Sequence, residues 1–166
     1  MTDASLPLVP HWIDGAAVPS TSGRTAPVYD PALGVATKNV GLAGAAEIEA
    51  AIASAAAAFP AWRDTSLAKR QTIMFRFRDL LDSRKGELAE ILTAEHGKVI
   101  SDAMGEIARG QEVAEFATTL AHHLKGEYSE NVSTDVDVYS TRQPLGVVGI
   151  ISPFNFPAMV PMWFFP

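Results

Sequence analysis

A short apolar run near the end of the chain, Gly146–Ile151, constrains the fold more than any other feature. Most of its residues are β-branched, Pro144 and Gly146 supply turn residues at its start, and Ser152-Pro153 follows its end. A run of this length between turn residues is typical of a strand that is buried on both faces, as in a parallel sheet. The sequence therefore predicts an α/β fold, with Pro157 at or near the first turn of a helix that follows the strand.

Apolar residues at helical spacing predict three helices before this strand, over Ala45–Phe59, from just after Ser66 to about His96, and over about Ser101–Lys125. We expect Pro60 to end the first helix, because proline removes a backbone donor. Gly97 suits the end of the second helix, which Gly86 can interrupt. The residues expected to face the core are Ile73, Met74, Phe77, Leu80 and Leu81 of the second helix, and Met104, Ile107, Val113, Phe116, Leu120 and Leu124 of the third.

The remaining segments are predicted to be extended. Residues 7–41 contain two hairpins, one turning at Asp14-Gly15 and one at Asp30–Gly34. In Glu127–Arg142, valines alternate with serine, threonine and aspartate, which is typical of one or two strands with a solvated face. These strands either form an arm that pairs with another chain or a hairpin that lies on its own domain.

Length and charge exclude several classes of protein. The 166 residues suffice for about one domain, and the net charge of −6 argues against nucleic acid or an anionic membrane as the main partner. The chain has no cysteine, so it contains no disulfide, thiolate metal site or cysteine nucleophile. The N-terminus has no secretory signal, and prolines interrupt the apolar run over 147–166, so we expect a cytoplasmic location.

Two patterns that suggest ligand sites do not hold. Gly97-Lys98 resembles the end of a phosphate-binding loop, but Leu92 and Val99 occupy the positions of its first glycine and its Ser/Thr. His122 and His123 are adjacent, so on a helix they point about 100° apart, and no metal-binding motif surrounds them. No metal site is therefore predicted.

The six residues after the strand, Ser152–Pro157, carry the chemical information. Ligands of open parallel sheets bind beyond the carboxyl ends of the strands, and Pro153 stiffens the turn there. We expect the rings of Phe154 and Phe156 to exclude water, so that the side-chain amide of Asn155 can donate to a carbonyl oxygen that gains negative charge. The alternative is that Asn155 only satisfies backbone groups at the turn.

The segment Gln143–Pro157 resembles the first cofactor-domain strand and turn of the aldehyde dehydrogenase superfamily. Further parts of the family pattern follow the same order along the chain, at His11–Gly15, Pro27–Pro31, Ala58–Trp62 with Lys69-Arg70, and Glu95–Lys98. Phe154 departs from the pattern, since most members have tryptophan there. Phe154 and the tail Pro157–Pro166 are similar to the methylmalonate-semialdehyde dehydrogenase branch, whose members acylate coenzyme A.

The resemblance implies a fold that is the N-terminal part of a Rossmann-like cofactor domain, with β-hairpins, three helices, a β oligomerisation arm and the first parallel strand. The implied divisions are hairpins and helices at 7–126, the arm at 127–144, and the strand, turn and helix start at 145–166. The arm implies a homo-oligomer, either a dimer or a tetramer. In the family the rest of the enzyme lies downstream, so the chain is expected to be a fragment.

The resemblance also implies roles for particular residues. Asn155 donates a hydrogen bond from its side-chain amide to the aldehyde oxygen. Arg109 lies where this branch binds the substrate carboxylate. A guanidinium suits that task because its fork pairs with both carboxylate oxygens. The alternative for Arg109 is a solvated arginine that forms ion pairs with Glu106 and Glu112. The residues implied to lie along the NAD site are Ile151, Ser152, Pro153 and Phe154.

The implied reaction is the oxidation of a small aldehyde through a covalent thioester. A cysteine thiolate adds to methylmalonate or malonate semialdehyde, hydride passes to NAD, and coenzyme A takes the acyl group. The cysteine, the general-base glutamate and the glycine-rich turn lie downstream in the family, so the chain alone is expected to be inactive. Two other functions stay open, namely a hydrolytic aldehyde dehydrogenase of another substrate class and a non-catalytic, truncated protein that joins full-length subunits through the arm.

Overall fold

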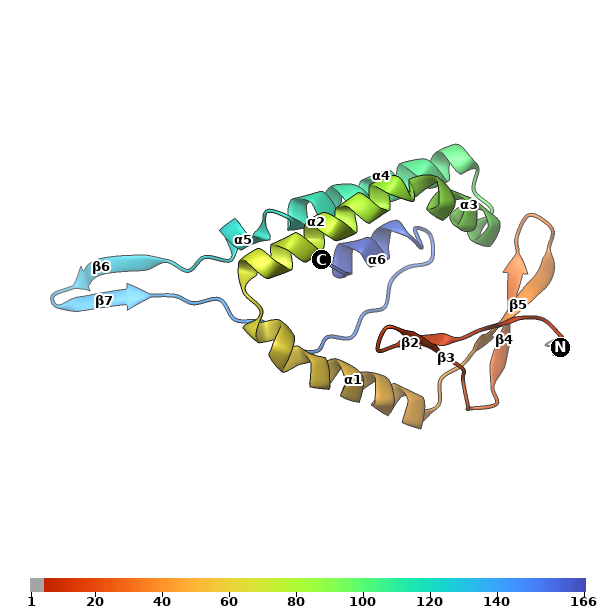
Figure 1. Ribbon diagram of the computed structural model, residues 1–166, viewed down its shortest axis with the longest axis horizontal. Helices are drawn as coiled ribbons and strands as arrows, with labels where there is room; N and C mark the ends of the chain where they lie inside the picture. The colour runs from red at the N-terminus through yellow and green to blue at the C-terminus, as the bar shows by residue number, and fades with distance from the viewer. Residues whose placement is uncertain (1–4) are drawn as a thin grey trace. The chain divides into compact units, whose positions relative to one another are not determined.

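The computed structural model describes residues 5–166, and its elements are labelled in Figure 1. The chain divides into two compact units. The first contains the described residues up to Trp62 together with Gly86–Gly105, and the second contains Arg63–Lys85 and Glu106–Pro166. Within the described range, no helix is both long enough and apolar enough to cross a membrane.

Short strands form the N-terminal part of the first unit. β2 (His11–Ile13) and β3 (Ala16–Val18) form an antiparallel hairpin, and both of its turn residues, Asp14 and Gly15, have positive φ values of 53° and 71°. A separate sheet has the order β1 (Leu8–Val9), β5 (Val35–Gly41) and β4 (Thr25–Asp30), with β1 parallel and β4 antiparallel to β5. Both predicted hairpins are confirmed.

Helix α1 (Ala45–Asp64) is longer than the sequence predicts. The prediction that Pro60 ends this helix is wrong, because Pro60 lies inside it. The φ angle that the proline ring imposes is itself close to the helical value. The last turn after Pro60 therefore continues the helix, although one backbone hydrogen bond is lost.

The predicted second helix is two helices in the structure. α2 (Leu67–Ser83) begins after Ser66, whose Oγ accepts from the backbone amide of Lys69 (3.4 Å) as an N-cap does. The break before α3 (Lys85–His96) lies at Arg84 rather than at Gly86. There the Ser83 hydroxyl donates to the carbonyl of Leu80 (3.1 Å) and competes with the backbone ladder. Gly97, with a φ of 83°, follows α3 as predicted.

The predicted third helix also ends early. α4 (Ile100–Ala117) stops before two threonines, and a single turn, α5 (Leu120–His123), follows it. The hydroxyls of Thr118 and Thr119 donate to the carbonyls of Glu115 and Phe116, each at 2.7 Å. Such hydroxyls offer carbonyls an alternative to the next helical amide, which favours an end to the helix here.

Helical spacing identified the core faces only in part. Leu81 and Ile107 are buried as predicted, whereas Phe116 is 59% exposed and stacks on His123. The other predicted core residues that stay exposed are Ile73, Leu80 and Leu124. Small residues instead occupy much of the buried face of α4, at Ala103, Ala114 and Ala117. The prediction was based on large side chains, and it missed a face on which most buried residues are alanine or glycine.

After α5 the chain forms a hairpin of β6 (Tyr128–Ser133) and β7 (Val136–Tyr139). The two strands are antiparallel, and every residue of both is exposed. Figure 1 shows the hairpin projecting away from the helices of its own unit. No residue of either strand is buried, so which of the two predicted roles the hairpin has stays a prediction.

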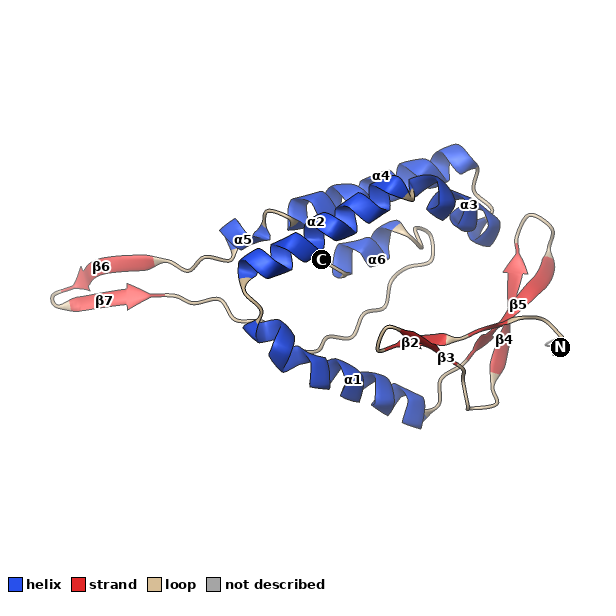
Figure 2. Cartoon of the chain, in the orientation of Figure 1, coloured by secondary structure: helices blue, strands red, loops and turns tan. Residues whose placement is uncertain are grey.

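The prediction of a buried strand at Gly146–Ile151 is wrong for this chain. These residues form a loop between β7 and the last helix, α6 (Met159–Phe164), as Figure 2 shows, and Ile151 is 99% exposed. A strand needs a neighbouring strand for its backbone hydrogen bonds. Among the described residues no strand pairs with this segment. The prediction of a helix after Pro157 is confirmed, since α6 begins two residues later.

Candidate functional site

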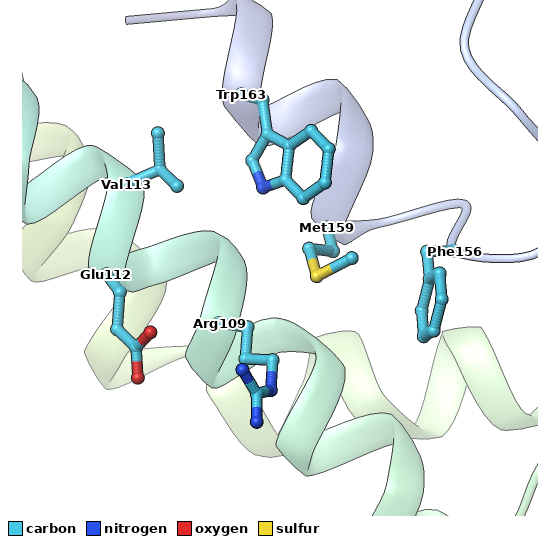
Figure 3. A pocket seen from close by; sticks show the side chains of 6 residues that line it. All are labelled: Arg109, Glu112, Val113, Phe156, Met159 and Trp163. Carbon is cyan, nitrogen blue, oxygen red and sulfur yellow. The ribbon is translucent and has the colours of Figure 1, made fainter.

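Arg109 and the segment that carries Asn155 belong to the same unit, the second one. A hollow of about 450 Å³ in this unit is lined by Arg109, Glu112, Val113, Phe156, Met159 and Trp163. Figure 3 shows three of these side chains projecting from α4 and two, Met159 and Trp163, projecting from α6. The hollow therefore lies where α6 meets α4.

Gly110 allows α6 to lie close against α4. A Cβ atom at this position would lie 3.2 Å from Met162 Cβ and 3.3 Å from Met159 Cα. Both methionines are buried, as is Val160 between them. Contacts this tight leave no room for a methyl group in a close-packed interior, so glycine sets the distance between the two helices.

Glu106 holds the N-terminal end of α6. Its Oε1 accepts hydrogen bonds from the backbone amides of Ala158 (2.8 Å) and Met159 (3.0 Å), and the residue is only 3% exposed. The first amides of a helix have no partner inside the helix, and a carboxylate satisfies them well because of its charge. In the sequence, Glu106 stands out only as an ion-pair partner for Arg109. The small residues Ala103 and Gly110, one turn before and after it, were the available signal for a buried face.

Arg109 is available to a ligand. Its predicted alternative, ion pairing with Glu106 and Glu112, is not observed, because no ion pair among the described residues involves Arg109 and Glu106 binds α6 instead. Glu112 lines the same hollow without forming an ion pair with Arg109. The lining thus carries one cation and one anion among apolar side chains, so a ligand would be selected by hydrogen-bond geometry rather than by net charge.

Asn155 lies in an exposed turn that starts at Phe154. Phe154 is 88% exposed and Phe156 is 40% exposed, so the expectation that these two rings exclude water is wrong for this chain. The two rings are exposed to solvent because the segment before them is a loop that no described strand covers. Phe156 lines the hollow with Arg109, but Asn155 does not. The structure therefore brings Arg109 to the neighbour of Asn155 and not to its amide.

Two of the residues predicted to meet NAD expose apolar surface. Ile151 and Phe154 present almost their whole side chains to solvent, and apolar surfaces of this kind can pack against a flat ring. The chain contains no GxGxxG turn of the kind that binds the phosphates of a dinucleotide. The described residues contain no cluster of three or more side chains able to hold a metal ion.

The fold and the family comparison define the class of protein. Residues 17–166 match the aldehyde dehydrogenase family, and the chain belongs to this family. The predicted resemblance and the predicted fold, the N-terminal part of an aldehyde dehydrogenase, are therefore confirmed.

Individual relatives are more specific. Malonate-semialdehyde dehydrogenase from Pseudomonas aeruginosa is 46% identical over 94% of this chain and 31% of the relative. The human mitochondrial acylating methylmalonate-semialdehyde/malonate-semialdehyde dehydrogenase is 42% identical over 98% of this chain and 30% of the relative. A Sinorhizobium meliloti structure assigned as a methylmalonate-semialdehyde dehydrogenase, complexed with NAD, matches with a TM-score of 0.92 and 43% identity, over 97% of this chain and 33% of that one. The chain thus spans about a third of the length of these relatives.

Proposed function

We propose that this chain forms the N-terminal part of an NAD-dependent, CoA-acylating aldehyde dehydrogenase. The proposed substrate is malonate or methylmalonate semialdehyde, which is oxidised to an acyl-CoA through a cysteine thioester. The observation that carries the proposal is the Arg109 guanidinium, which has no ion-pair partner among the described residues and lines a hollow with Phe156, Met159 and Trp163. Relatives at 46% and 42% identity, named for these two semialdehydes, support it.

Two residues of the chain have direct roles in this proposal. Arg109 binds the substrate carboxylate through two parallel hydrogen bonds, which orients the molecule. Asn155 donates to the aldehyde oxygen as negative charge develops on it during the attack of the thiolate. Ile151, Ser152, Pro153 and Phe154 would hold NAD, which would supply the hydride acceptor, and coenzyme A would be the acceptor of the acyl group.

The test uses the complete reading frame that contains this chain. We expect the purified protein to reduce NAD with malonate or methylmalonate semialdehyde and to depend on coenzyme A for turnover. Turnover without coenzyme A would favour the hydrolytic alternative, and a preference for NADP would correct the cofactor. No reduction of either cofactor with small semialdehydes would contradict the proposal.

The 166-residue chain alone is expected to produce no NADH, because it contains no cysteine to attack the aldehyde. Detectable NADH formation by the purified chain would refute this expectation. The remaining alternative, a non-catalytic partner of full-length subunits, requires a stop codon after Pro166 in an intact gene. Sequencing the gene beyond this codon therefore separates the alternatives.

We propose that the β6–β7 hairpin is the arm through which subunits associate into a homo-oligomer, a dimer or a tetramer. The exposed valines Val132, Val136 and Val138 and the two open strand edges support this role. Light scattering on the complete protein measures the oligomeric state, and Val138→Lys is expected to shift it toward smaller species. A cytoplasmic location belongs to the same proposal and is tested by cell fractionation.

A further inference from the structure

We infer that Glu106 is a positioning residue, whose carboxylate fixes the turn that carries Asn155 to the helix that carries Arg109. The inference rests on the proposed function, since it assigns Glu106 to the same site. The starting observation is a contact of Glu106 with α6. Binding of a substrate by Arg109 would not require this contact. One buried carboxylate oxygen binds two backbone amides more than 50 residues further along the chain (sequence separations of 52 and 53).

Helix α6 has no cap of its own. Ala158 is its N-cap residue, and no side chain at this position satisfies the first amides of the helix. A serine or aspartate at position 158 would cap α6 locally. Such a local cap would stabilise the helix without fixing it to α4. Glu106 does both, because it belongs to α4 and binds α6.

The tether between this contact and Asn155 is short. Asn155 lies three residues before Ala158, and three residues span at most about 11 Å even when fully extended. Pro157, between them, has a restricted φ angle, and the carbonyl of Phe156 accepts from the amide of Val160 (3.2 Å). When Ala158 is held, Asn155 has little freedom to move away from α4.

The same helix sets the place of Arg109. Glu106 and Gly110 are four residues apart and both contact the start of α6, whereas Arg109 lies between them in sequence and lines the hollow. A rigid helix thus fixes the spacing between the carboxylate-binding cation and the turn with the oxyanion donor. This spacing has to match the two ends of one semialdehyde, because misplacement by about 1 Å is known to cost enzymes up to about 100-fold in rate.

Hydrogen exchange tests the contact without any enzymatic activity. In the 166-residue chain, Glu106→Ala is expected to speed exchange of the Ala158 and Met159 amides by at least about 10-fold, because the two amides lose their acceptor. Glu106→Gln keeps an acceptor oxygen and is expected to keep most of the protection. The matched control is Glu115→Ala on the same helix, which removes hydrogen bonds to Arg78 and Gln111 and none to α6. Unchanged exchange in Glu106→Ala would overturn the inference.

Kinetics of the complete enzyme test the positioning role. Glu106→Ala is expected to lower kcat about 10- to 100-fold with little change in KM for the semialdehyde, and Glu106→Gln to restore most of kcat. Glu115→Ala is expected to keep the parent kcat. If kcat fell equally in Glu106→Ala and Glu115→Ala, and by the same factor as the folded fraction of each variant, Glu106 would only stabilise the fold. That result would overturn the inference. An inactive parent enzyme would refute the proposed function, whereas faster exchange at Ala158 in Glu106→Ala would still support Glu106 as the residue that holds the turn.

Discussion

Glu47 uses the same chemistry as Glu106, in the other unit. Near the start of α1 it accepts from the backbone amides of Gly44 (2.6 Å) and Thr21 (2.5 Å). These two hydrogen bonds, with a smaller contribution from nearby His11, lower the pKa of Glu47 from 4.5 to about 2. The carboxylate thereby joins the first turn of a helix to a loop 26 residues earlier in the chain.

Glu47 is expected to make stability depend on pH in the acid range. Because its pKa is lower in the folded chain than in the unfolded one, its contribution is complete above about pH 4.5 and is lost as the pH falls toward about 2. Glu47→Gln should therefore lower the free energy of unfolding at neutral pH and show a shallower loss on acidification than the parent. Urea unfolding at a series of pH values measures this difference. Parallel pH profiles of the two proteins would contradict it.

Arg109 is expected to discriminate substrates by their carboxylate. In the complete enzyme, Arg109→Leu should raise KM for malonate semialdehyde by roughly 10- to 100-fold, since a charge-assisted hydrogen bond is lost. Propanal, which has no carboxylate, should be oxidised with little change. Steady-state kinetics with the two aldehydes measure the difference. Equal losses for both would indicate that Arg109 acts on structure rather than on the substrate.

Among the elements, α4 shows that small side chains decide where a neighbouring helix can lie. On α4, Gly110 meets α6, while Ile107 and Ala114 belong to the buried face of the same helix and are fully buried. The bulky apolar residue Phe116 lies outside this face and stays exposed. The close approach of α6 to α4 therefore depends on the absence of a side chain at position 110 more than on any large side chain.

Two glycines of α4 provide a matched pair of substitutions. Gly110→Ala places a methyl group against Met159 and Met162 and is expected to destabilise the chain by about 1–3 kcal/mol through overpacking. Gly105→Ala meets nothing within 4 Å and is expected to stabilise it by roughly 0.5–1 kcal/mol, because alanine is the better helix former. Thermal unfolding of both variants measures the two effects. Changes of the same sign would show that α6 does not lie on Gly110 in solution.

The hairpin of β6 and β7 has its own internal order although it is exposed. Asp137 accepts from the amide of Asn131 (2.9 Å) and from the hydroxyl of Tyr128 (2.7 Å), and the Asn131 hydrogen bond is the main cause of its lowered pKa. The pairing register shifts at this point, and Asn131 has a positive φ of 49°. Asp137 therefore fixes the shape of a bulge in the hairpin without any support from a core.

At the scale of the whole molecule, the chain exposes apolar residues that its sequence marks as interior. Leu145, directly before the predicted strand, and Ile151, its last residue, are 97% and 99% exposed. The loop between them has the apolar composition of a buried strand. It is nevertheless exposed to solvent, as a linker is. The sheet that would cover it is not formed by the described residues.

The exposed loop predicts a measurable difference between this chain and the complete protein. In the 166-residue chain, amides of Gly146–Ile151 are expected to exchange at nearly the rate of an unstructured peptide, because they have no strand partner. In the complete protein, the same amides should be protected by at least about 100-fold if they form the first strand of the cofactor sheet. Exchange measured by mass spectrometry covers both proteins. Equally fast exchange in both would contradict the predicted strand.

The sequence by itself determined the family, the two N-terminal hairpins, the position of most helices and the extended conformation within Glu127–Arg142. These features depend on local signals, such as Asp14-Gly15 in a turn, Ser66 at a helix start and Gly97 at a helix end. Only the tertiary structure decided that Gly146–Ile151 is a loop in this chain, that Arg109 has no ion-pair partner among the described residues, and that Glu106 caps α6. The physical reason is that these contacts join residues far apart in the chain. A strand partner, or a hydrogen-bond acceptor about 50 residues away, produces no periodic pattern in the sequence, because it depends on which surfaces the folded chain brings together.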